Sequence, residues 1–317
     1  FVGWNDTENG TGNYYQDGQE VINVTDEDEA VIVFYAVWAP VKVTLTFDKT
    51  GGSGGTNYVD IIFGNKLPAA IAPRKAGYKF DGYYKNSDCS GAMYYDSDMT
   101  PLCLSDIGEN NSLFAKWLPM PNTLVLEPNG GDGQSIRIST ETDAVISLAN
   151  YPIKRLGYTL SGWNTSDCAD GLSYSKDAEY TLPASDYEVI LYATWSPNAL
   201  RVVFNGNGNT SGTTNSLNGY CDRDIVLPES GYEKLGYTFI GWSLSVIGEK
   251  LYSSASLFRL PIVNTDRVEL FAQWKLVNYK ITYNLDGGTN SLNNPDEYNY
   301  SSASILLQNP SRLGYRF

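Results

Sequence analysis

The stretch GYTFIGW, residues 236–242, is one copy of a phrase that recurs along the chain. Related copies, GYKFDGY and GYTLSGW, occupy residues 77–83 and 157–163, and the chain opens inside such a phrase with FVGW. A second phrase, consisting of Phe or Tyr, then Ala, any residue and Trp, also recurs. The closing aromatic residues of the first phrase are Trp4, Tyr83, Trp163 and Trp242, and those of the second are Trp38, Trp117, Trp195 and Trp274.

The two series share one period. Successive copies are 79, 80 and 79 residues apart in the first series and 79, 78 and 79 in the second, and together they contain all seven tryptophans. Self-similarity at a fixed spacing indicates tandem modules. We therefore expect complete modules at residues 39–117, 118–195 and 196–274. Residues 1–38 would be the C-terminal half of a module, and residues 275–317 the N-terminal half of another.

Each period reads as strands and turns. It begins with a run in which apolar and polar residues alternate, as in VKVTLTF at 41–47, and this period of two predicts a half-buried strand. A turn rich in Gly and Asn follows, such as EPNGGDG at 127–133, and the period closes on a strand such as VILYATW at 189–195. No segment shows a helical period beyond about two turns. The sequence thus predicts a mainly β fold, α+β at most, built from small modules.

The connectors between modules are short. They read AP, LPMP, SPNA and KLVN after the four closing tryptophans. Such short connections leave little freedom, so neighbouring modules should abut. We expect a linear rod of modules, each about 30 Å across and together on the order of 120 Å long.

The two ends of the chain complete each other in sequence. The final LGYRF and the initial FVGW would join into one uninterrupted phrase, and residues 277–317 and 1–38 together make up one period. Neither half contains all the strands that a module needs. We therefore expect a segment of a longer array, whose halves are completed by neighbouring copies through the continuing chain or by strand donation.

These features resemble the Listeria–Bacteroides repeat family, also called internalin B-type B repeats. The paired phrases carry the resemblance, together with NGG at 129–131 and DGG at 286–288, and it spans essentially the whole chain. It implies tandem β-grasp-like (ubiquitin-like) modules of surface proteins from bacteria and some protists. Three features depart from the pattern: Tyr83 replaces the Trp of the first phrase, Leu160 replaces the Phe, and the period is long.

Composition excludes several classes of function. The formal net charge of −14 disfavours nucleic acid and anionic membrane surfaces as partners. Histidine is absent, which removes the usual general base and the usual metal ligand. No apolar run approaches the ~18–20 residues of a membrane-spanning helix. We expect neither a cofactor nor direct membrane insertion.

The repeated aromatic residues are best explained as structural anchors. A module of ~79 residues buries only about 60–65% of its surface on folding, so it needs large side chains in its core. The glycine before each closing aromatic, as at Gly162 and Gly241, would permit a β-bulge or close packing of a ring. The alternative is that the tryptophans form platforms on which sugars stack.

Four cysteines are candidates for disulfides: Cys89, Cys103, Cys168 and Cys221. No C-x-x-C spacing favours a metal site. A bridge from Cys89 to Cys103 would close a loop of about 15 residues and stabilise the fold by ~3 kcal/mol. Cys168 matches Cys89 in position, and its remaining partner is Cys221 in the next module. Either bridge would imply an oxidising, extracellular setting; the alternative is four reduced thiols.

Seven asparagines stand in N-glycosylation sequons, a number only slightly above chance and compatible with a surface protein. They are Asn5, Asn9, Asn23, Asn110, Asn164, Asn209 and Asn299.

Signals of enzymatic chemistry are weak. The acidic run TDEDEA at 25–30 does not recur and is better explained as a solvated loop than as a Ca²⁺ or acid–base site. The glycine-rich stretch NGNGNTSG at 205–212 lacks the Lys and the helix of a phosphate-binding loop, so a turn is the better interpretation. No lysine recurs at a strand position suited to a Lys–Asn crosslink.

The sequence therefore favours a non-enzymatic, extracellular structural protein, a stalk or fibre segment at the cell surface. Its partners would be adjacent copies of itself or the continuing chain. The alternative is an adhesin whose divergent loops bind a glycan or a protein of a host or neighbouring surface. The stretches GNYYQDG at 12–18 and AMYYDSD at 92–98 are the candidates for an exposed aromatic patch of that kind.

Overall fold

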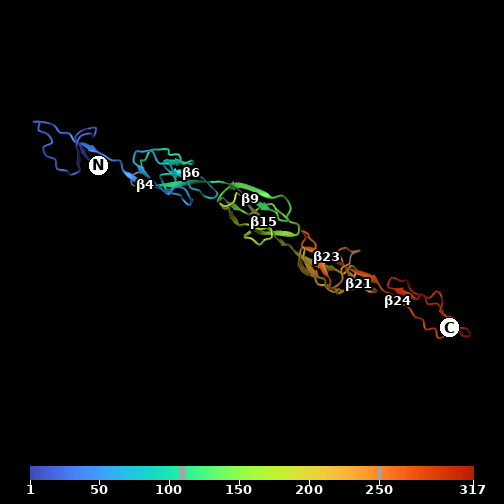
Figure 1. Ribbon diagram of the computed structural model, residues 1–317. Helices are drawn as coiled ribbons and strands as arrows, with labels where there is room; N and C mark the ends of the chain where they lie inside the picture. The colour runs from blue at the N-terminus through green and yellow to red at the C-terminus, as the bar shows by residue number, and fades with distance from the viewer. Residues whose placement is uncertain (107–110, 249–250) are drawn as a thin grey trace. The chain divides into compact units, whose positions relative to one another are not determined.

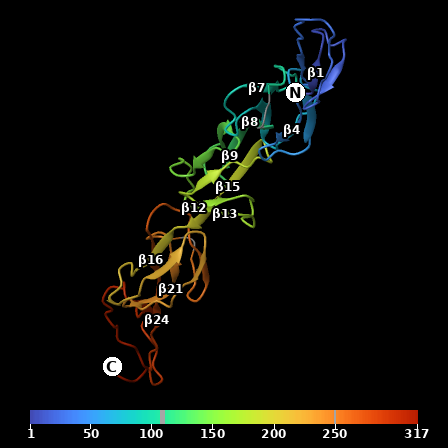
Figure 2. The same cartoon turned by 90° about the vertical axis from the view of Figure 1, so that its left-hand side faces the viewer.

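The structure is a computed structural model that describes residues 1–106, 111–248 and 251–317. Within these residues every regular element is a β-strand. The chain divides into two compact units. The first contains residues 1–124, 137–146 and 180–189, and the second contains residues 125–136, 147–179 and 190–317. Figures 1 and 2 show the succession of small sheets from the N-terminus, in blue, to the C-terminus, in red.

The first sheets belong to residues 1–117. Residues 1–38 form a sheet in the order β2-β1-β3, with strands β1 (Gly3–Asn5), β2 (Tyr14–Gln16) and β3 (Tyr35–Val37). The next sheet has the order β5-β4-β8-β6-β7. Its strands are β4 (Lys42–Asp48), β5 (Tyr58–Ile62), β6 (Tyr78–Tyr84), β7 (Met93–Asp96) and β8 (Ser112–Pro119). Strands β4 and β8 are parallel, and the other pairs are antiparallel.

The next period repeats this order. A five-stranded sheet, β10-β9-β15-β12-β13, is accompanied by the pair β11-β14. The strands are β9 (Pro121–Glu127), β10 (Ile136–Glu141), β11 (Val145–Ser147), β12 (Tyr158–Asn164), β13 (Ser173–Ser175), β14 (Glu179–Thr181) and β15 (Glu188–Pro197).

A four-stranded sheet in the order β18-β16-β23-β21 follows, with the pairs β17-β20, β19-β22 and, near the C-terminus, β24-β25. Strands β16 and β23 are again parallel. The strands are β16 (Ala199–Asn205), β17 (Ser211–Gly212), β18 (Leu217–Tyr220), β19 (Asp224–Val226), β20 (Tyr232–Glu233), β21 (Tyr237–Ser243), β22 (Leu257–Arg259), β23 (Arg267–Leu276), β24 (Asn278–Lys280) and β25 (Glu297–Asn299).

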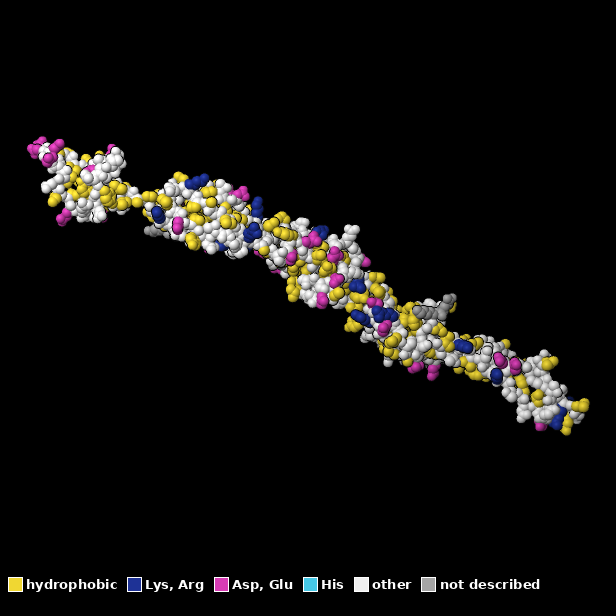
Figure 3. All heavy atoms as spheres, viewed as in Figure 1, with side chains coloured by type: hydrophobic (Ala, Val, Ile, Leu, Met, Phe, Trp, Pro, Cys, Tyr) yellow, Lys and Arg dark blue, Asp and Glu magenta, His cyan; other side chains and the backbone are white. Residues whose placement is uncertain are grey.

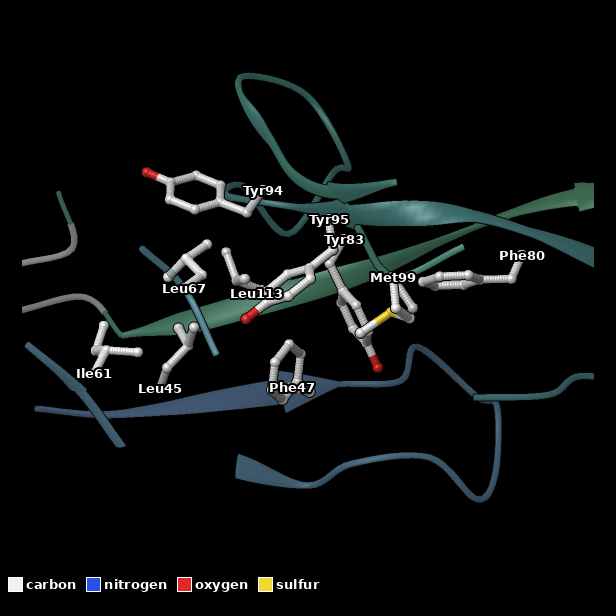
Figure 4. Close-up of a cluster of buried hydrophobic side chains, with 11 residues drawn as sticks. Leu45, Phe47, Ile61, Leu67, Phe80, Tyr83, Tyr94, Tyr95, Met99 and Leu113 are labelled. Atoms are coloured by element: carbon white, nitrogen blue, oxygen red, sulfur yellow. The ribbon is translucent and has the colours of Figure 1, made fainter. Parts of the chain in front are cut away.

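The alternation seen in the sequence sets which face of each strand is buried. On β4, Leu45 and Phe47 are buried while Lys42, Thr44 and Thr46 are exposed. These two residues enter a core cluster with side chains from the paired strands and from the loops that cover the sheet (Figure 4). Its other members are Ile61, Leu67, Phe80, Tyr83, Tyr94, Tyr95, Met99, Leu113 and Ala115. A second core cluster includes Trp242 of β21 and buried side chains from β16 and β23 of the same sheet.

A β-bulge marks the glycine of the GYxFxGW phrase. The pairing register shifts between Phe80 and Gly82, and again between Phe239 and Gly241. A Cβ on Gly82 would lie 2.5 Å from the carbonyl oxygen of Tyr95, so only glycine lets the neighbouring strand approach this closely. The bulge directs the following aromatic side chain into the core.

The prediction of a mainly β chain of tandem repeats is confirmed. In the described residues no helix is long and apolar enough to cross a membrane. On the face shown in Figure 3, Lys and Arg side chains and Asp and Glu side chains are both scattered among hydrophobic and other atoms.

Candidate functional site

The repeated phrases meet at the glycine-rich turn after the first strand of each module. The indole N–H of Trp117 donates to the carbonyl oxygen of Lys49 at 2.9 Å. Two further tryptophans repeat this bond at 2.9 Å, from Trp195 to Pro128 and from Trp274 to Gly206. The closing strand of each module therefore holds the turn that follows its opening strand, although the two are 67 or 68 residues apart in sequence.

The asparagine of the NGG turn makes a second connection to the same strand. Asn129 has a left-handed φ of +46°, which Asn tolerates better than most residues. Its amide nitrogen donates to the carbonyl oxygens of Ala193 and Asp167, each at 3.0 Å. Asn207 repeats the first bond, to Ala272 at 2.8 Å. In these two repeats the Ala of the second phrase thus accepts a bond from the turn asparagine through its carbonyl oxygen. The Trp of the same phrase binds the carbonyl oxygen of the residue that precedes that asparagine.

The last glycine of the turn has no room for a side chain. A Cβ on Gly131 would lie 2.6 Å from Cζ2 of Trp195, and one on Gly52 would lie 2.5 Å from Cζ2 of Trp117. The ring therefore packs directly on the backbone of the turn. This contact explains the pairing of glycine and tryptophan in these two repeats, whereas Asn209 holds the position of Gly131 in the following repeat.

The Gly–Tyr pair that opens each copy of the first phrase lies in a turn, which we call the GY turn. A cation lies over the tyrosine of each GY turn. The side-chain nitrogen of Lys75 lies 4.2 Å from the ring centroid of Tyr78. The guanidinium carbon of Arg155 lies 4.2 Å from the centroid of Tyr158. The pairs Lys234–Tyr237 and Arg312–Tyr315 repeat the contact at 4.7 and 4.1 Å. Each cation–π contact contributes about 0.5–1 kcal/mol at a partly exposed site, and it accounts for the basic residue that precedes every GY phrase.

The GY turn at Gly77 makes a joint with the following repeat. The carbonyl oxygen of Gly77 accepts the N–H of Met120 at 2.9 Å, and the carbonyl of Met120 accepts the N–H of Thr142 at 2.9 Å. Tyr78 donates its phenol hydrogen to the carboxylate of Asp143. Gly77 has a φ of +73°, and a Cβ there would lie 2.8 Å from Cγ2 of Thr142. Only glycine can occupy this position.

The turn at Gly157 makes the same joint one period later. Its carbonyl oxygen accepts the N–H of Asn198 at 2.9 Å, and the carbonyl of Asn198 accepts the N–H of Cys221 at 2.9 Å. Tyr158 donates to the carboxylate of Asp222 at 2.9 Å. These bonds reproduce those of the first joint atom for atom. We call the two sets the Tyr78 joint and the Tyr158 joint.

Charge strengthens the Tyr158 joint. Asp222 also pairs with the guanidinium of Arg259 at 3.0 Å. The hydrogen bond from Tyr158, followed by that from Arg259, lowers the pKa of the Asp222 carboxyl below its ordinary value. Burial, followed by the bond to Asp222, raises the pKa of the Tyr158 phenol. The joint is therefore built for an ionised Asp222 and a neutral Tyr158.

A third joint keeps the glycine contact but carries no carboxylate at the matching position. Val277 donates its N–H to the carbonyl oxygen of Gly236 at 2.9 Å. A Cβ on Gly236 would lie 2.2 Å from Cβ of Tyr300. In the repeat alignment Ser301 stands where Asp143 and Asp222 stand. This joint therefore lacks the charge-assisted bond of the other two.

The structure places the predicted anchor residues in two environments. Tyr83, Trp163 and Trp242 are fully buried in their modules. Trp117, Trp195 and Trp274 are half-buried over the glycine-rich turns. Trp4 and Trp38, in residues 1–38, are 39% and 70% exposed. Trp195 is half-buried and its ring packs on the backbone at Gly131, which is the contact expected of a structural anchor.

No disulfide joins the four cysteines, which are all free thiols. The predicted bridges therefore find no support. Cys89 directs its sulfur toward the carbonyl oxygen of Ala115 at 3.5 Å, while Cys103 packs against the core cluster. Cys168 is exposed, whereas Cys221 is fully buried within the Tyr158 joint. A bridge between Cys168 and Cys221 would require that joint to open.

The sequons also divide by environment. Asn5 and Asn164 are buried, and their amide nitrogens donate to the carbonyl oxygens of Gly12 and Gly171, each at 3.2 Å. Those nitrogens are not available to a glycan in the folded protein. Asn9 and Asn23 are exposed, and Asn209 and Asn299 are partly exposed. Asn110 lies outside the described residues.

The two stretches proposed as aromatic patches are unlike each other. Tyr94 and Tyr95 are buried in the core, so AMYYDSD is not a binding surface. In GNYYQDG, Tyr14 is 47% exposed. The acidic run at 25–30 is solvent-exposed, and within the described part of the chain no group of three or more Asp, Glu or Cys residues could hold a metal ion.

Sequence reasoning missed the carboxylates of the joints. Asp143 and Asp222 lie five residues before Leu148 and Leu227, which are both buried. Aligning the periods on these leucines places the two acids at one position, and this was the signal available. Taken singly, each acid is indistinguishable from a solvated side chain.

Comparisons with known proteins agree with the repeats. The profile described as the Listeria-Bacteroides repeat domain matches residues 44–107, 123–194, 201–273 and 279–317. Two proteins of Evansella cellulosilytica are similar to this chain. One, named "Putative Gly-rich membrane protein", is 25% identical over all of this chain and 33% of its own length. The other, named "Putative membrane protein", is 28% identical over 90% of this chain and 40% of its own length. The chain thus spans about a third to two fifths of each relative.

Proposed function

Because the chain belongs to the Listeria-Bacteroides repeat domain family, we propose that it is a non-enzymatic structural segment of an extracellular surface protein. Its modules would form a stalk or fibre that extends from the cell surface. The partners of each module would be the modules before and after it, in the same chain or in adjacent copies. The surface location rests on the family and on the relatives named as membrane proteins.

One observation carries this proposal: the joint between repeats is itself repeated. The Tyr78 and Tyr158 joints use the same backbone bonds, the same left-handed glycine and the same Tyr–Asp bond. A flexible linker would need none of these contacts. A joint specified by side chains and backbone together restricts how one module is presented to the next, which is the property a stalk requires.

Small-angle scattering of variants can test this role. Gly157→Val places a side chain against Ile262, since a Cβ there would lie 2.8 Å from Cγ2 of that residue. We expect the scattering of this variant to show greater flexibility than that of the parent chain. Gly133→Val is the matched control, because Gly133 also has a positive φ, +99°, but a Cβ there meets nothing within 4 Å. Equal scattering from the two variants would contradict a stalk built on specified joints.

An adhesin is the second candidate, and one loop favours it. Residues 85–91 and 165–171 are mostly polar, whereas the matching loop after β21 exposes Leu244, Val246 and Ile247, the last to 91%. The carbonyl oxygen of Val246 accepts from Asn207 at 2.9 Å, which holds the backbone of this loop. Binding of the chain to a panel of surface proteins, lost in Ile247→Ser with Leu172→Ser as the control, would support this role.

A further inference from the structure

Two arginines stand side by side on the exposed face of one sheet. Arg201 of β16 and Arg267 of β23 are direct partners in the parallel register, and both are exposed. Neighbouring strands are about 4.8 Å apart, so paired side chains lie next to each other on one face. Like charges placed directly opposite each other destabilise a sheet. A negatively charged group bound to both arginines would remove this repulsion.

Neither guanidinium forms an ion pair within the described residues. In the part of the chain that the structure describes, the guanidinium of Arg201 donates only to the hydroxyl of Ser216, at 3.2 and 3.0 Å, and the guanidinium of Arg267 makes neither an ion pair nor a hydrogen bond. In the preceding repeat the positions of Ser216 and Arg267 hold Arg137 and Glu188, which form an ion pair. At these positions the sheet of residues 196–274 therefore has two arginines without an ion pair in place of the ion pair of the preceding repeat.

A hollow lies beside this pair. Its volume is about 290 Å³, and its lining includes Ala199, Arg201, Asn218, Tyr220 and Asp266. Ala199 is the direct partner of Tyr220, and Arg201 is the direct partner of Asn218. The small side chain of Ala199 leaves one side of the Tyr220 ring open, and Tyr220 is 56% exposed. The residues that line the hollow thus include a tyrosine, an asparagine, an aspartate and one arginine, Arg201, and Arg267 is the partner of Arg201 on the neighbouring strand.

These groups match the chemistry of an acidic sugar. Guanidinium groups bind carboxylate or sulfate oxygens with charge-assisted bonds. An exposed tyrosine ring offers an apolar face with a polar edge, suited to the C–H face of a pyranose. The amide of Asn218 and the carboxylate of Asp266 can pair with ring hydroxyls, which a bare anion does not have. The carboxylate of Asp266 also disfavours a simple anion in the same hollow.

We propose that the face formed by β16, β18 and β23 binds an acidic polysaccharide, with Arg201 and Arg267 on its anionic group and Tyr220 under a sugar ring. The ligand class is a uronic-acid or sulfated glycan. The proposal rests on the surface location proposed above. Its binding assay is separate from the scattering test of the joints, so either idea can fail alone.

Calorimetric titration of the full chain with defined glycans tests the proposal. The probes are polygalacturonate, its methyl ester, dextran sulfate and unsubstituted dextran, at two salt concentrations. We expect at least one of the two charged polymers to bind: polygalacturonate if the site prefers a carboxylate, or dextran sulfate if it prefers a sulfate. The methyl ester and the unsubstituted dextran should bind at least tenfold more weakly. Arg201→Thr with Arg267→Glu should weaken binding about tenfold or more, and Tyr220→Ala several-fold.

Matched variants distinguish binding at this site from a general effect of the net charge of the protein. Lys79→Thr with Lys176→Glu changes the net charge by the same amount at exposed positions elsewhere, and Tyr187→Ala removes a tyrosine that is 65% exposed. Neither should alter binding by more than about twofold. Loss of binding in the lysine variant, equal binding of the methyl ester, or absence of binding to both charged polymers would overturn the proposal. Full affinity in Tyr220→Ala would reduce the site to an anion contact and overturn its assignment to a sugar.

Discussion

Trp195 donates its indole N–H to the carbonyl oxygen of Pro128 across 2.9 Å, so that the last strand of a repeat fixes the turn after its first strand. The same bond recurs in two other repeats. It closes each module by joining residues that lie 67 or 68 positions apart. Contacts of such long sequence separation slow folding, because the entropy of closing the intervening loop must be overcome.

Replacing this indole should loosen the module that it closes. Trp195→Phe keeps a ring but removes the N–H, which should lower the stability of residues 118–195 by about 1 kcal/mol. Native-state hydrogen exchange of the amides in β12 and β15 would measure the change. Trp38→Phe is the control, because Trp38 is 70% exposed and should show a far smaller effect. Equal effects from the two substitutions would show that the bond to Pro128 does not matter.

Substitutions at Asn129 should distinguish the contribution of its hydrogen bonds to stability from the cost of its backbone strain. Asn129→Ala loses two bonds and keeps a left-handed φ, so we expect a loss of about 2–3 kcal/mol. Asn129→Gly loses the same bonds but relieves the strain, so it should cost about 1 kcal/mol less than the alanine variant. Thermal unfolding of both variants would measure the difference. A glycine variant less stable than the alanine variant would contradict the role assigned to φ.

The sequence predicted the repeat, the strands and the turns because these depend on local pattern. The period-two alternation of residues 41–47 and the glycines at 129–131 are visible without a structure. The role of Asn129 was not visible, because its partner Ala193 offers only a backbone carbonyl. The stretch 92–98 was a candidate for an exposed aromatic patch, yet Tyr94 and Tyr95 both lie in the core cluster. The pairing register of β6 and β7 shifts at this point, so the two neighbouring tyrosines do not alternate between faces.

The joints escaped prediction for a different reason. A carboxylate such as Asp222 acquires its role only when the following repeat is placed against the GY turn. Its bond partner Tyr158 is 64 residues away in the preceding repeat. Nothing in the neighbourhood of either residue distinguishes it from a surface side chain. Only comparison of equivalent positions between repeats could identify the pair.

Native cysteine reactivity should follow burial. Cys168 is exposed and should be alkylated first, although its bond to Asp167 raises the pKa of its thiol. Burial raises the pKa of the Cys89 and Cys103 thiols, which should slow their reaction at neutral pH. Cys221 is fully buried and should react roughly 100-fold more slowly than Cys168. Mass spectrometry of the alkylated protein, with and without denaturant, would show the order, and early labelling of Cys221 would contradict a closed Tyr158 joint.

The Tyr158 joint should weaken in acid and not near neutrality. Tyr158 and Arg259 lower the pKa of Asp222 below its ordinary value of 3.8, so the folded joint favours the ionised carboxylate. A lowered pKa means that the stabilisation is fully present above the ordinary value and is lost as the pH falls through the pKa of the folded state. The pKa values of Tyr158 and Arg259 are raised and that of Asp222 is lowered, so these three groups keep one protonation state between pH 5 and 8, and no change is expected in that range.

Carbon-detected NMR of the Asp222 carboxyl would measure this titration directly. We expect a midpoint below 3.8 in the parent chain and a rise toward that value in Tyr158→Phe, with a further rise when Arg259→Gln is added. Tyr237→Phe is the matched control, because the equivalent position in the next repeat is Ser301 and no carboxylate depends on that phenol. An Asp222 midpoint that stays the same in Tyr158→Phe would show that the phenol does not hold the carboxylate, and the joint would then depend on its backbone bonds alone.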